Sequence, residues 1–454
     1  MAANQLSGIW KRFRRSVTNN NEQSAKTSSK KSAPFRNLIL HLHPPAVNAG
    51  TLRFNLTFGL GGMAALLFII QVATGIMLRF VYEPFPGIAY DSIRLLQDQI
   101  LFGQLIRNIH HWSGIFIILI TFLHLLRVYF TSAFHHPRQF NWVLGLGLLV
   151  LVISLNFTGY LLPWDQLAYW AITVSTGMLA YIPLIGAGLR EIILGGNEVG
   201  AATLLIFYNL HTSILPLLFL SLMAFHFWRV RKAGGVVVVP VNDTNNGSRF
   251  VSTYPNLVAR ELVVALVLIA VILMLSVLIN APLQTKANPD FSPNPAKAPW
   301  YFQGFQEMLR HLDPLFAVMI IPLFGLLTLI VLPYLKYDNA PVGVWFISPK
   351  GRQAGFAAAV IAFILSMAVI LTDEYVVLFR GLFSHLPGYF TRGILPVGLL
   401  ITVVLTITAI LKKKYRLTNN ETRQTVFIIL VIGFILFSLT SIVFRGAGMH
   451  LSWP

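Results

Sequence analysis

Runs of about 20 consecutive apolar residues recur along this 454-residue chain, and they limit its fold more than any other feature. A helical run of this length crosses the roughly 30 Å hydrocarbon core of a bilayer. Because a helix bonds its own backbone groups internally, it is one of the few structures that can span lipid. Only 11% of the residues are charged, against about 25% in soluble proteins. The sequence therefore predicts an all-α polytopic membrane protein.

Nine spans are predicted, and the distribution of basic residues orients them. Most of the 34 Lys and Arg residues lie in the N-terminal tail or in loops on the same side as that tail. The positive-inside rule assigns this side to the cytoplasm, so the net charge of +18 needs no nucleic-acid partner to explain it. The predicted spans cover roughly 55–80, 109–131, 141–161, 203–227, 258–281, 315–335, 354–372, 394–411 and 424–444.

The spans and the loops between them divide the chain into five parts. The first 36 residues lack an apolar core, so we expect them to be a basic, largely disordered tail without a cleavable signal peptide. The apolar segment 167–196 is interrupted by Pro183 and several glycines, which indicates one or two helices lying on the membrane surface. The parts are a basic cytoplasmic tail (1–50), a four-helix part (51–232), a cytoplasmic linker loop (233–256), a three-helix part (257–375) and two extra transmembrane helices (376–454).

Four histidines form two pairs of similar spacing within two of the predicted spans. His110 and His124 are fourteen residues apart in the second span, and His211 and His226 are fifteen apart in the fourth. On an α-helix fourteen residues rise about 21 Å and return within about 40° of the same face, whereas fifteen overshoot by about 60°. Because the two spans run in the same direction, we expect His110 beside His211 at the outer level and His124 beside His226 at the inner level.

Two histidines at each level favour haem iron over other ligands. A single membrane histidine often caps a polar contact or lines a water cavity, but four in matched positions indicate a function. Zinc requires four ligands at one level, commonly with Cys or carboxylate among them. Haem iron takes two axial ligands along one line. The chain has no cysteine, so we predict two non-covalent haems whose filled axial positions restrict them to electron transfer.

Two pairs of glycines repeat the fourteen-residue interval. They are Gly61 with Gly75 in the first span and Gly145 with Gly159 in the third. Such glycines often serve only close helix packing. Their shared spacing with the histidines predicts instead that they let the backbone approach the two haems, with Gly75 and Gly159 at the inner one.

Two arginines and the remaining histidines complete the candidate set. Arg107 and Arg127 each lie three residues outside a histidine of the second span. There they are placed to meet haem propionates, although snorkelling to water is the usual behaviour of such arginines. The histidines without a matched partner are expected to be surface or loop residues, namely His111, His135, His136, His311, His385 and His450.

These residues, together with three further stretches, resemble cytochrome b of the cytochrome bc and bf quinol oxidoreductase complexes. The stretches are LPWDQLAYWA (162–171), YPNLVARELV (254–263) and PWYF (299–302), and the resemblance extends over about residues 50–375. The fifteen-residue interval and PWDQ are similar to the bf type, in which the four-helix and three-helix parts are separate chains. Here the two parts are fused.

The resemblance implies a Q cycle with proton translocation. Quinol would be oxidised in an outer pocket at Tyr301, passing one electron to a Rieske iron–sulfur protein and thence to a c-type cytochrome. The other electron would cross two b haems and reduce quinone at an inner pocket near the first span and the 229–260 loop, where His41 and His43 are candidates for proton delivery. The implied protein is the cytochrome b subunit of a dimeric, multi-subunit quinol–cytochrome c oxidoreductase, surrounded by lipid in a bacterial cytoplasmic membrane.

The sequence departs from the family at two functional positions. The cysteine that tethers a third haem in the bf type is replaced by Gly59, so this tether is absent. The Pro-Glu-Trp-Tyr of the outer pocket is replaced by Ala-Pro-Trp-Tyr at 298–301, which removes a proton acceptor. Either water takes the proton, or Glu307 or Asp290 substitutes. The alternative for Glu307 is an ion pair with Arg310, one turn further on.

Two other functions remain open from the sequence. One is a di-haem membrane anchor of another quinone-linked oxidoreductase without a Rieske partner, although PWYF and the surface helices are unnecessary in an anchor. The other is a proton-coupled transporter whose membrane histidines relay protons. A visible spectrum would separate the transporter from both haem proteins, and the composition of the purified complex would separate the two haem proteins.

Overall fold

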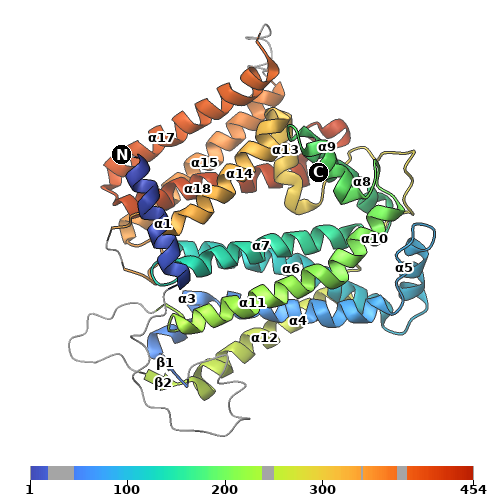
Figure 1. Ribbon diagram of the computed structural model, residues 1–454, viewed down its shortest axis with the longest axis horizontal. Coiled ribbons are helices and arrows are strands. Elements are labelled where there is room, and N and C mark those ends of the chain that lie inside the picture. Colours follow the sequence, from blue (N-terminus) through green and yellow to red (C-terminus); the bar gives the residue numbers. More distant parts are fainter. Residues whose placement is uncertain (1, 19–44, 238–249, 339–340, 376–385, 453–454) are drawn as a thin grey trace.

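The computed structural model of the protein describes residues 2–18, 45–237, 250–338, 341–375 and 386–452. Within these residues, nine helical segments are long and apolar enough to cross a membrane, which confirms the predicted number. Several extend beyond the predicted spans, because polar turns continue the helices past the apolar runs. The long helices lie side by side and run roughly across the view in Figure 1.

The first group of membrane helices contains all four candidate haem ligands. Helix α12 packs against α4 and α6, so it covers one side of this group. In Figure 1 these helices form the lower half of the molecule. The group consists of α4 (Leu60–Arg79), α6 (Gly103–Phe130), α7 (Gln139–Tyr160), α10 (Ala201–Asn209) continuing through η5 (Leu210–Ile214) into α11 (Leu215–Lys232), and α12 (Thr253–Leu278).

The second group contains the last four membrane segments. Helices α15, α17 and α18 pack against one another. Their apolar core is continuous with the ends of α6 and α7, since Tyr129 and Trp142 are buried in one cluster with Ala358 and Ile428. The two extra spans are therefore built into the core. The group consists of η7 (Phe316–Ile320), α14 (Ile321–Val331), η8 (Leu332–Tyr334), α15 (Pro349–Tyr375), η9 (Phe390–Ile394), α17 (Leu395–Tyr415), α18 (Asn419–Leu439) and η10 (Thr440–Phe444).

Wide π-helical turns interrupt several membrane helices just before a proline. Segments η5, η7 and η9 are followed by Pro216, Pro322 and Pro396. A proline inside a helix has no N–H to donate, and its ring clashes with the carbonyl four residues earlier. A π turn relieves the clash by inserting one residue, and such turns are frequent at functional sites.

Short helices gather at one end of the molecule, which is called the outer end here because the sequence predicts that it faces outward. Residues 167–196 form two helices, separated by η4 (Met178–Tyr181) and Pro183. They lie close to α13 and the C-terminus at one end of the molecule (Figure 1). The elements of this end are α5 (Ala89–Asp98), α8 (Gln166–Gly177), α9 (Gly186–Leu194), η6 (Trp300–Phe302), α13 (Gln303–His311) and η11 (Ala447–Met449).

The opposite end is called the inner end, after the side predicted for it. The N-terminal tail there was predicted to be largely disordered, and this prediction was wrong for its first part. Residues Ala2–Thr18 form helix α1, in which Phe13 packs edge-on against Phe140 and Tyr334. Trp10, Phe13 and Val17 recur at helical spacing among basic residues, so the segment is an amphipathic helix. The rest of this end comprises η3 (Ala49–Leu52), α3 (Phe54–Thr57) and the antiparallel strands β1 (Ala46–Asn48) and β2 (Phe250–Ser252).

The linker between the two parts is only partly described. Strand β2 and the start of α12 at Thr253 occupy its last residues, so the helix begins four residues before the predicted boundary. His41, His43 and residues 238–249 lie outside the described residues.

Candidate functional site

The outer histidine pair has the geometry of two axial ligands. The imidazole rings of His110 on α6 and His211 in η5 have centroids 6.1 Å apart, with their planes at 77°. Two imidazoles that bind one metal from opposite sides, each at about 2 Å, would have ring centres roughly 6 Å apart. The spacing therefore fits one metal ion between the two rings.

Hydrogen bonds fix which ring nitrogen of each outer histidine is free. The Nδ1 of His211 lies 2.9 Å from the carbonyl oxygen of Leu155, which can only accept, so Nδ1 donates. The Nδ1 of His110 lies 2.8 Å from Oγ1 of Thr74, whose own hydroxyl donates to the carbonyl of Ile70. Both rings thus carry their proton on Nδ1 and leave Nε2 as the ligating atom. Such partners orient metal-bound histidines.

The π turn at η5 explains the unequal spacing of the two histidine pairs. His211 lies within the turn Leu210–Ile214, and His226 lies on the α-helix that follows. One π turn adds one residue to the helix without changing the direction of the later side chains. Fifteen residues with a π turn are therefore equivalent to fourteen without one, and the overshoot of about 60° expected for an ideal helix is removed.

Each of the four glycines faces one of the four histidines. A Cβ atom built on Gly75 would lie 3.3 Å from Cε1 of His110, and one built on Gly159 would lie 2.5 Å from Cε1 of His211. The backbones of α4 and α7 thus pass directly beside the imidazoles of the outer pair. The predicted assignment of these two glycines to the inner level was wrong, because α4 and α7 both run from the inner to the outer end.

The other two glycines repeat this arrangement at the inner level. A Cβ on Gly61 would lie 3.3 Å from Cε1 of His124, and a Cβ on Gly145 would lie 3.6 Å from Cε1 of His226. The first distance is tight, whereas the second is an ordinary van der Waals contact. The Nδ1 of His124 is buried and has no hydrogen-bond partner in the described part of the chain.

The two arginines of α6 are both buried, but they are bound differently. Arg107 donates to the carbonyls of Ala281 and Pro282, which ties the segment after α12 to α6. Arg127 donates from Nε to the carbonyl of Leu56, while its Nη2 is buried without a hydrogen-bond partner among the described residues. A buried, unpaired guanidinium nitrogen is suited to a carboxylate such as a haem propionate. Arg127 fits this role better than Arg107.

A haem needs fewer ligands from the protein than a bare metal ion does. Within the residues that the structure describes, no three or more His, Asp or Glu side chains are arranged to hold a metal ion. A haem brings its own equatorial nitrogens and needs only two axial ligands from the protein. The residues present at each level therefore fit a bis-histidine haem.

Gly59, at the position of the missing cysteine tether, is required by the backbone. Its φ is +69°, a conformation that favours glycine. A Cβ there would lie 2.9 Å from Cγ1 of Val264 on α12. This position serves the packing of α12 against the start of the first span.

Tyr301 lies in η6, at the junction between the two groups of helices. Its ring packs against the apolar core of the four-helix group. Its hydroxyl is buried and has no hydrogen-bond partner among the described residues. Burial, with a smaller contribution from Tyr160, raises the pKa of Tyr301 well above 10. The side chain is thus a neutral phenol with an unused donor, which suits contact with a substrate oxygen.

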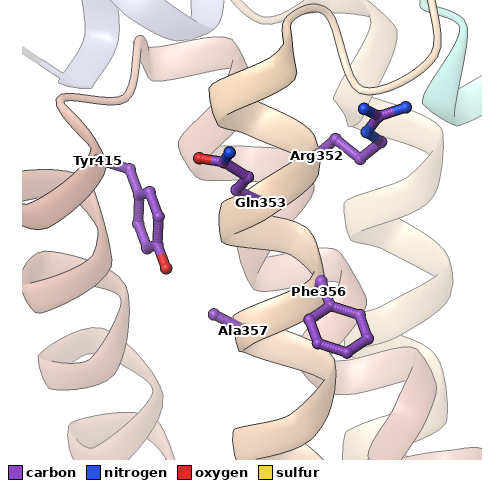
Figure 2. A pocket seen from close by; sticks show the side chains of 5 residues that line it. All are labelled: Arg352, Gln353, Phe356, Ala357 and Tyr415. Atoms are coloured by element: carbon purple, nitrogen blue, oxygen red, sulfur yellow. The ribbon is translucent and has the colours of Figure 1, made fainter.

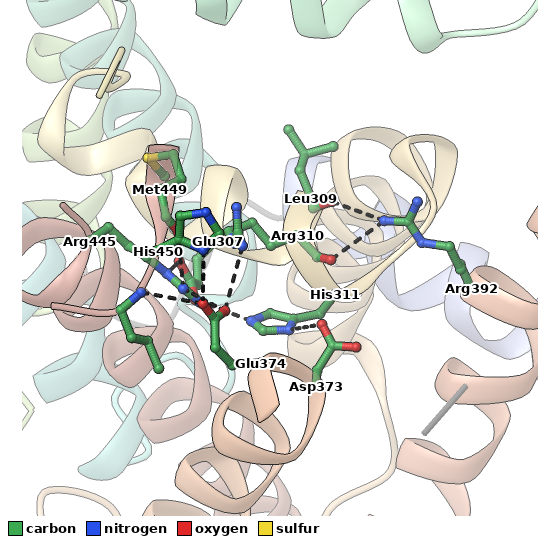
Figure 3. Close-up of polar contacts among 11 residues, drawn as sticks. Glu307, Leu309, Arg310, His311, Asp373, Glu374, Arg392, Arg445, Met449 and His450 are labelled. Atoms are coloured by element: carbon green, nitrogen blue, oxygen red, sulfur yellow. Dashed lines mark hydrogen bonds and ion pairs between the residues drawn. The ribbon is translucent and has the colours of Figure 1, made fainter. Parts of the chain in front are cut away.

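Glu307 is fully buried in a network of charged residues at the outer end (Figure 3). Its carboxylate accepts from Nε and Nη2 of Arg445, at 3.0 Å and 2.5 Å, and lies 3.1 Å from Nε2 of His311. The expected pairing with Arg310 was wrong, since Arg310 pairs with Glu374 at 3.5 Å. Asp290, the other predicted carboxylate, is exposed.

His311 was expected at the surface, but its side chain is only 5% exposed. Its Nδ1 lies 2.9 Å from Asp373 and its Nε2 faces Glu307. Burial lowers the pKa of His311, but hydrogen bonds to Asp373 and Glu307 outweigh burial and raise it overall. Glu307 lies one turn earlier on α13, but Asp373 lies at the end of α15, 62 residues away, and only the fold brings it to His311.

The network is electrically balanced when His311 carries a proton. Its carboxylates are Glu307, Asp373 and Glu374, and its guanidiniums are Arg310 and Arg445. Burial raises the pKa of Glu307, but hydrogen bonds from His311 and Arg445 outweigh it, so the pKa is lowered overall. Burial lowers the pKa of Lys297 overall, against a smaller raising effect of Glu307. The exposed His450 lies 3.7 Å from Glu374.

Stability should therefore depend on pH through this network. The contribution of His311 is fully present below its ordinary pKa of 6.5 and is lost as pH rises through its raised pKa. The contribution of Glu307 is present above 4.5 and is lost as pH falls through its lowered pKa. We expect the thermal unfolding midpoint of the solubilised protein to fall above neutral pH, and His311→Gln to weaken that fall. The exposed His136→Gln is the control. An unchanged profile in His311→Gln would contradict the balance described above.

Two pockets lie at the inner end. One of about 510 Å³ is bounded by Asn55 and Phe58 at the start of the first span and by residues from Val344 to Arg352 before α15. A second, of about 470 Å³, lies between α15 and α17, with Gln353 and Tyr415 on opposing sides (Figure 2). This first pocket lies near the start of the first span, where an inner pocket was predicted. Among the described residues its other wall comes from 344–352. Residues 238–249 of the loop predicted to line the pocket lie outside the described residues, so that part of the prediction stays untested.

Thr74 and Thr158 are functional candidates that the sequence reasoning missed. The hydroxyl oxygen of Thr74 accepts a hydrogen bond from Nδ1 of His110, and the hydroxyl of Thr158 lies 3.4 Å from Nδ1 of His211. Each immediately precedes one of the glycines at the outer level, so the dipeptide Thr-Gly occurs at the same height in the first and third spans. This repeated dipeptide was the available signal.

Comparisons with known proteins agree with this arrangement. A family model described as cytochrome b/b6/petB matches residues 49–234. The chain is similar to cytochrome b6 of Synechococcus elongatus, at 43% identity over 180 residues, which cover 40% of this chain and 84% of that protein. Cytochrome b6 of Heliomicrobium gestii is 45% identical with the same coverage. A solved structure described as a hyperthermophilic respiratory complex III has a TM-score of 0.60 at 24% identity, covers 85% of this chain and 90% of that chain, and shows a shared fold.

Proposed function

The chain belongs to the cytochrome b/b6 family, and from this we propose that it is the haem-carrying, quinone-binding subunit of a quinol–cytochrome c oxidoreductase. We further propose that quinol is oxidised at the outer end and quinone is reduced at the inner end. Quinol oxidation releases two electrons and two protons, and one electron would pass to a Rieske iron–sulfur partner and then to a c-type cytochrome. The other electron would cross to the inner end.

The observation that carries this proposal is the outer histidine pair. His110 and His211 are 6.1 Å apart by ring centroids, and both rings leave Nε2 free through bonds from Nδ1. His124 and His226 lie at the inner level of the same two helical segments, where they face Gly61 and Gly145. Two b haems, when bound between these pairs, supply one-electron redox centres stacked across the membrane. His110 with His211 and His124 with His226 would hold these groups, and the chemistry supplied would be electron transfer.

Tyr301 is the residue proposed to contact quinol. The high pKa of Tyr301 keeps its hydroxyl protonated, so it can donate a hydrogen bond to a quinol oxygen. Pro299 cannot accept the departing proton. That Glu307 accepts it stays a prediction. Its carboxylate is already bonded to Arg445 and His311, which favours a positioning role over proton transfer.

The inner pocket beside Asn55 and Phe58 is proposed to bind quinone. Its walls include Trp345 and Phe346, which provide flat apolar surfaces for a quinone ring, and the polar side chains of Ser348 and Arg352. Basic residues are concentrated in the loops at this end, so we propose that it faces the cytoplasm of a bacterium.

The proposed function is tested on the complex purified from the native membrane. We expect two b-type haems per chain, their reduction by added quinol, and a Rieske protein and a c-type cytochrome among the co-purifying subunits. A colourless protein would favour a transporter. A di-haem protein that reacts with quinone but has no Rieske partner would instead favour the membrane anchor.

Replacement of Tyr301 by phenylalanine should weaken quinol oxidation. The substitution removes one hydrogen bond to a substrate oxygen, worth about 1 kcal/mol, so kcat/KM should fall by roughly fivefold to tenfold. Both haems should remain, because Tyr301 makes no contact with the candidate ligands. Tyr181→Phe, a half-exposed tyrosine at the same end, is the matched control. An unchanged kcat/KM in Tyr301→Phe would remove the residue from the proposed quinol site.

A further inference from the structure

Hydrogen bonds and an ion pair join the C-terminal segment 442–451 to the segment that carries Tyr301. The side chain of Asn294 accepts a hydrogen bond from the backbone N–H of Gly448, at 2.5 Å. The ammonium group of Lys297 donates to the carbonyl of Ile442, at 3.2 Å. Arg445 binds Glu307. Residues 294–307 are thus held at three points, two before Tyr301 and one after it.

Arg445 is the centre of this attachment. Its side chain is fully buried. It donates to both carboxylate oxygens of Glu307, to Glu374 at the end of α15 at 2.8 Å, and to the carbonyl of Met449 at 3.1 Å (Figure 3). One side chain therefore connects α13, α15 and the C-terminal segment. The planar guanidinium fixes the direction of these bonds as well as their distance.

Helix α13 is also packed directly against the last membrane helix. A Cβ on Gly304 would overlap the side chains of Ser438 and Phe434 of α18, so the backbone of α13 lies directly against these side chains. Phe305 and Phe434 pack with ring centroids 5.0 Å apart. Because α13 starts only two residues after Tyr301, a shift of α13 relative to α18 would also move the tyrosine.

We propose that the C-terminal segment 442–451 positions the quinol-contacting Tyr301, with Arg445 as a positioning residue that acts through Glu307. This inference rests on the proposed quinol site, and it gives the two extra spans a role in catalysis. A displacement of about 1 Å at a reacting centre can lower a rate up to a hundredfold. Breaking a buried ion pair on one side also leaves a buried charge without a partner.

The test uses steady-state quinol oxidation by the purified complex, with a short-chain naphthoquinol and a short-chain benzoquinol as substrates. Arg445→Lys keeps the positive charge but loses the bidentate hydrogen bonding to Glu307, whereas Arg445→Gln loses both. We expect kcat/KM to fall about tenfold in the lysine variant and further in the glutamine variant, with KM raised and both haems retained. Arg94→Gln is the matched control, since Arg94 forms an exposed ion pair with Asp98 at the same end.

A double variant covers the case in which a single substitution prevents folding. Arg445→Gln with Glu307→Gln leaves no unpaired buried charge, so both haems should be retained while KM for quinol stays raised. Wild-type KM and kcat in Arg445→Lys and in the double variant would overturn the inference. Loss of haem in parallel with activity would overturn it too, by showing a purely structural role. A wild-type complex that does not oxidise quinol would refute the proposed function itself.

Discussion

Replacement of His226 by leucine is expected to remove one of the two b haems and leave the other in place. His226 lies fifteen residues beyond His211 on the same π-interrupted helix, at the level of His124. A haem whose iron loses an axial ligand in an apolar site loses its main attachment to the protein, since no covalent link is available in a chain without cysteine. His124→Leu should remove the same haem.

The measurement is the haem-to-protein ratio, combined with a redox titration followed in the visible spectrum. We expect the ratio to fall from about two to about one in either variant, with a single b-type transition remaining. His111→Leu is the control, because His111 is adjacent to His110 on α6 but its ring packs against Trp112. Two b-type transitions in both His124→Leu and His226→Leu would overturn the ligand assignment.

The membrane spans and the histidine levels could be predicted because both follow from simple periodicity. Apolar runs of about 20 residues define the spans, and a fourteen-residue interval returns to one face of a helix. The unequal interval in the fourth span could not be explained in this way. Its explanation is the π turn before Pro216, which is visible only in the backbone.

The charged network at the outer end could not be predicted, because its members are distant in sequence. Glu307 and Arg445 are 138 residues apart, and the last two spans, which carry Arg445 to this end, had no assigned role. Local reasoning therefore selected Arg310, one turn from Glu307, as its partner. The fold instead brings Arg445 to Glu307 from the end of the last span.

The level of the glycines was predicted wrongly for a different reason. The interval of fourteen residues was correctly recognised, but the direction of each span was not applied to it. The first and third spans run outward, so Gly75 and Gly159 lie beside His110 and His211. The second span runs inward, which reverses the order of its histidines. The corrected assignment changes which haem a substitution should affect.

Gly159→Ala is accordingly expected to weaken the outer haem and spare the inner one. The new Cβ would lie 2.5 Å from Cε1 of His211 and 2.9 Å from its Nδ1, both shorter than a van der Waals contact. The ring cannot retreat without losing the bond from Nδ1 to the carbonyl of Leu155. Overpacking of this kind costs roughly 1–3 kcal/mol, so the affinity for the outer haem should fall about fivefold to 150-fold.

Gly145→Ala provides the matched control on the same helix. Its Cβ would lie 3.6 Å from Cε1 of His226, an ordinary contact, so both haems should remain. The two variants add the same methyl group beside equivalent histidines and differ only in the space available. Redox titration of the b-type absorbance should therefore show loss of one transition in Gly159→Ala and two intact transitions in Gly145→Ala. Equal haem content in the two variants would mean that His211 is free to move, and that Gly159 serves helix packing alone.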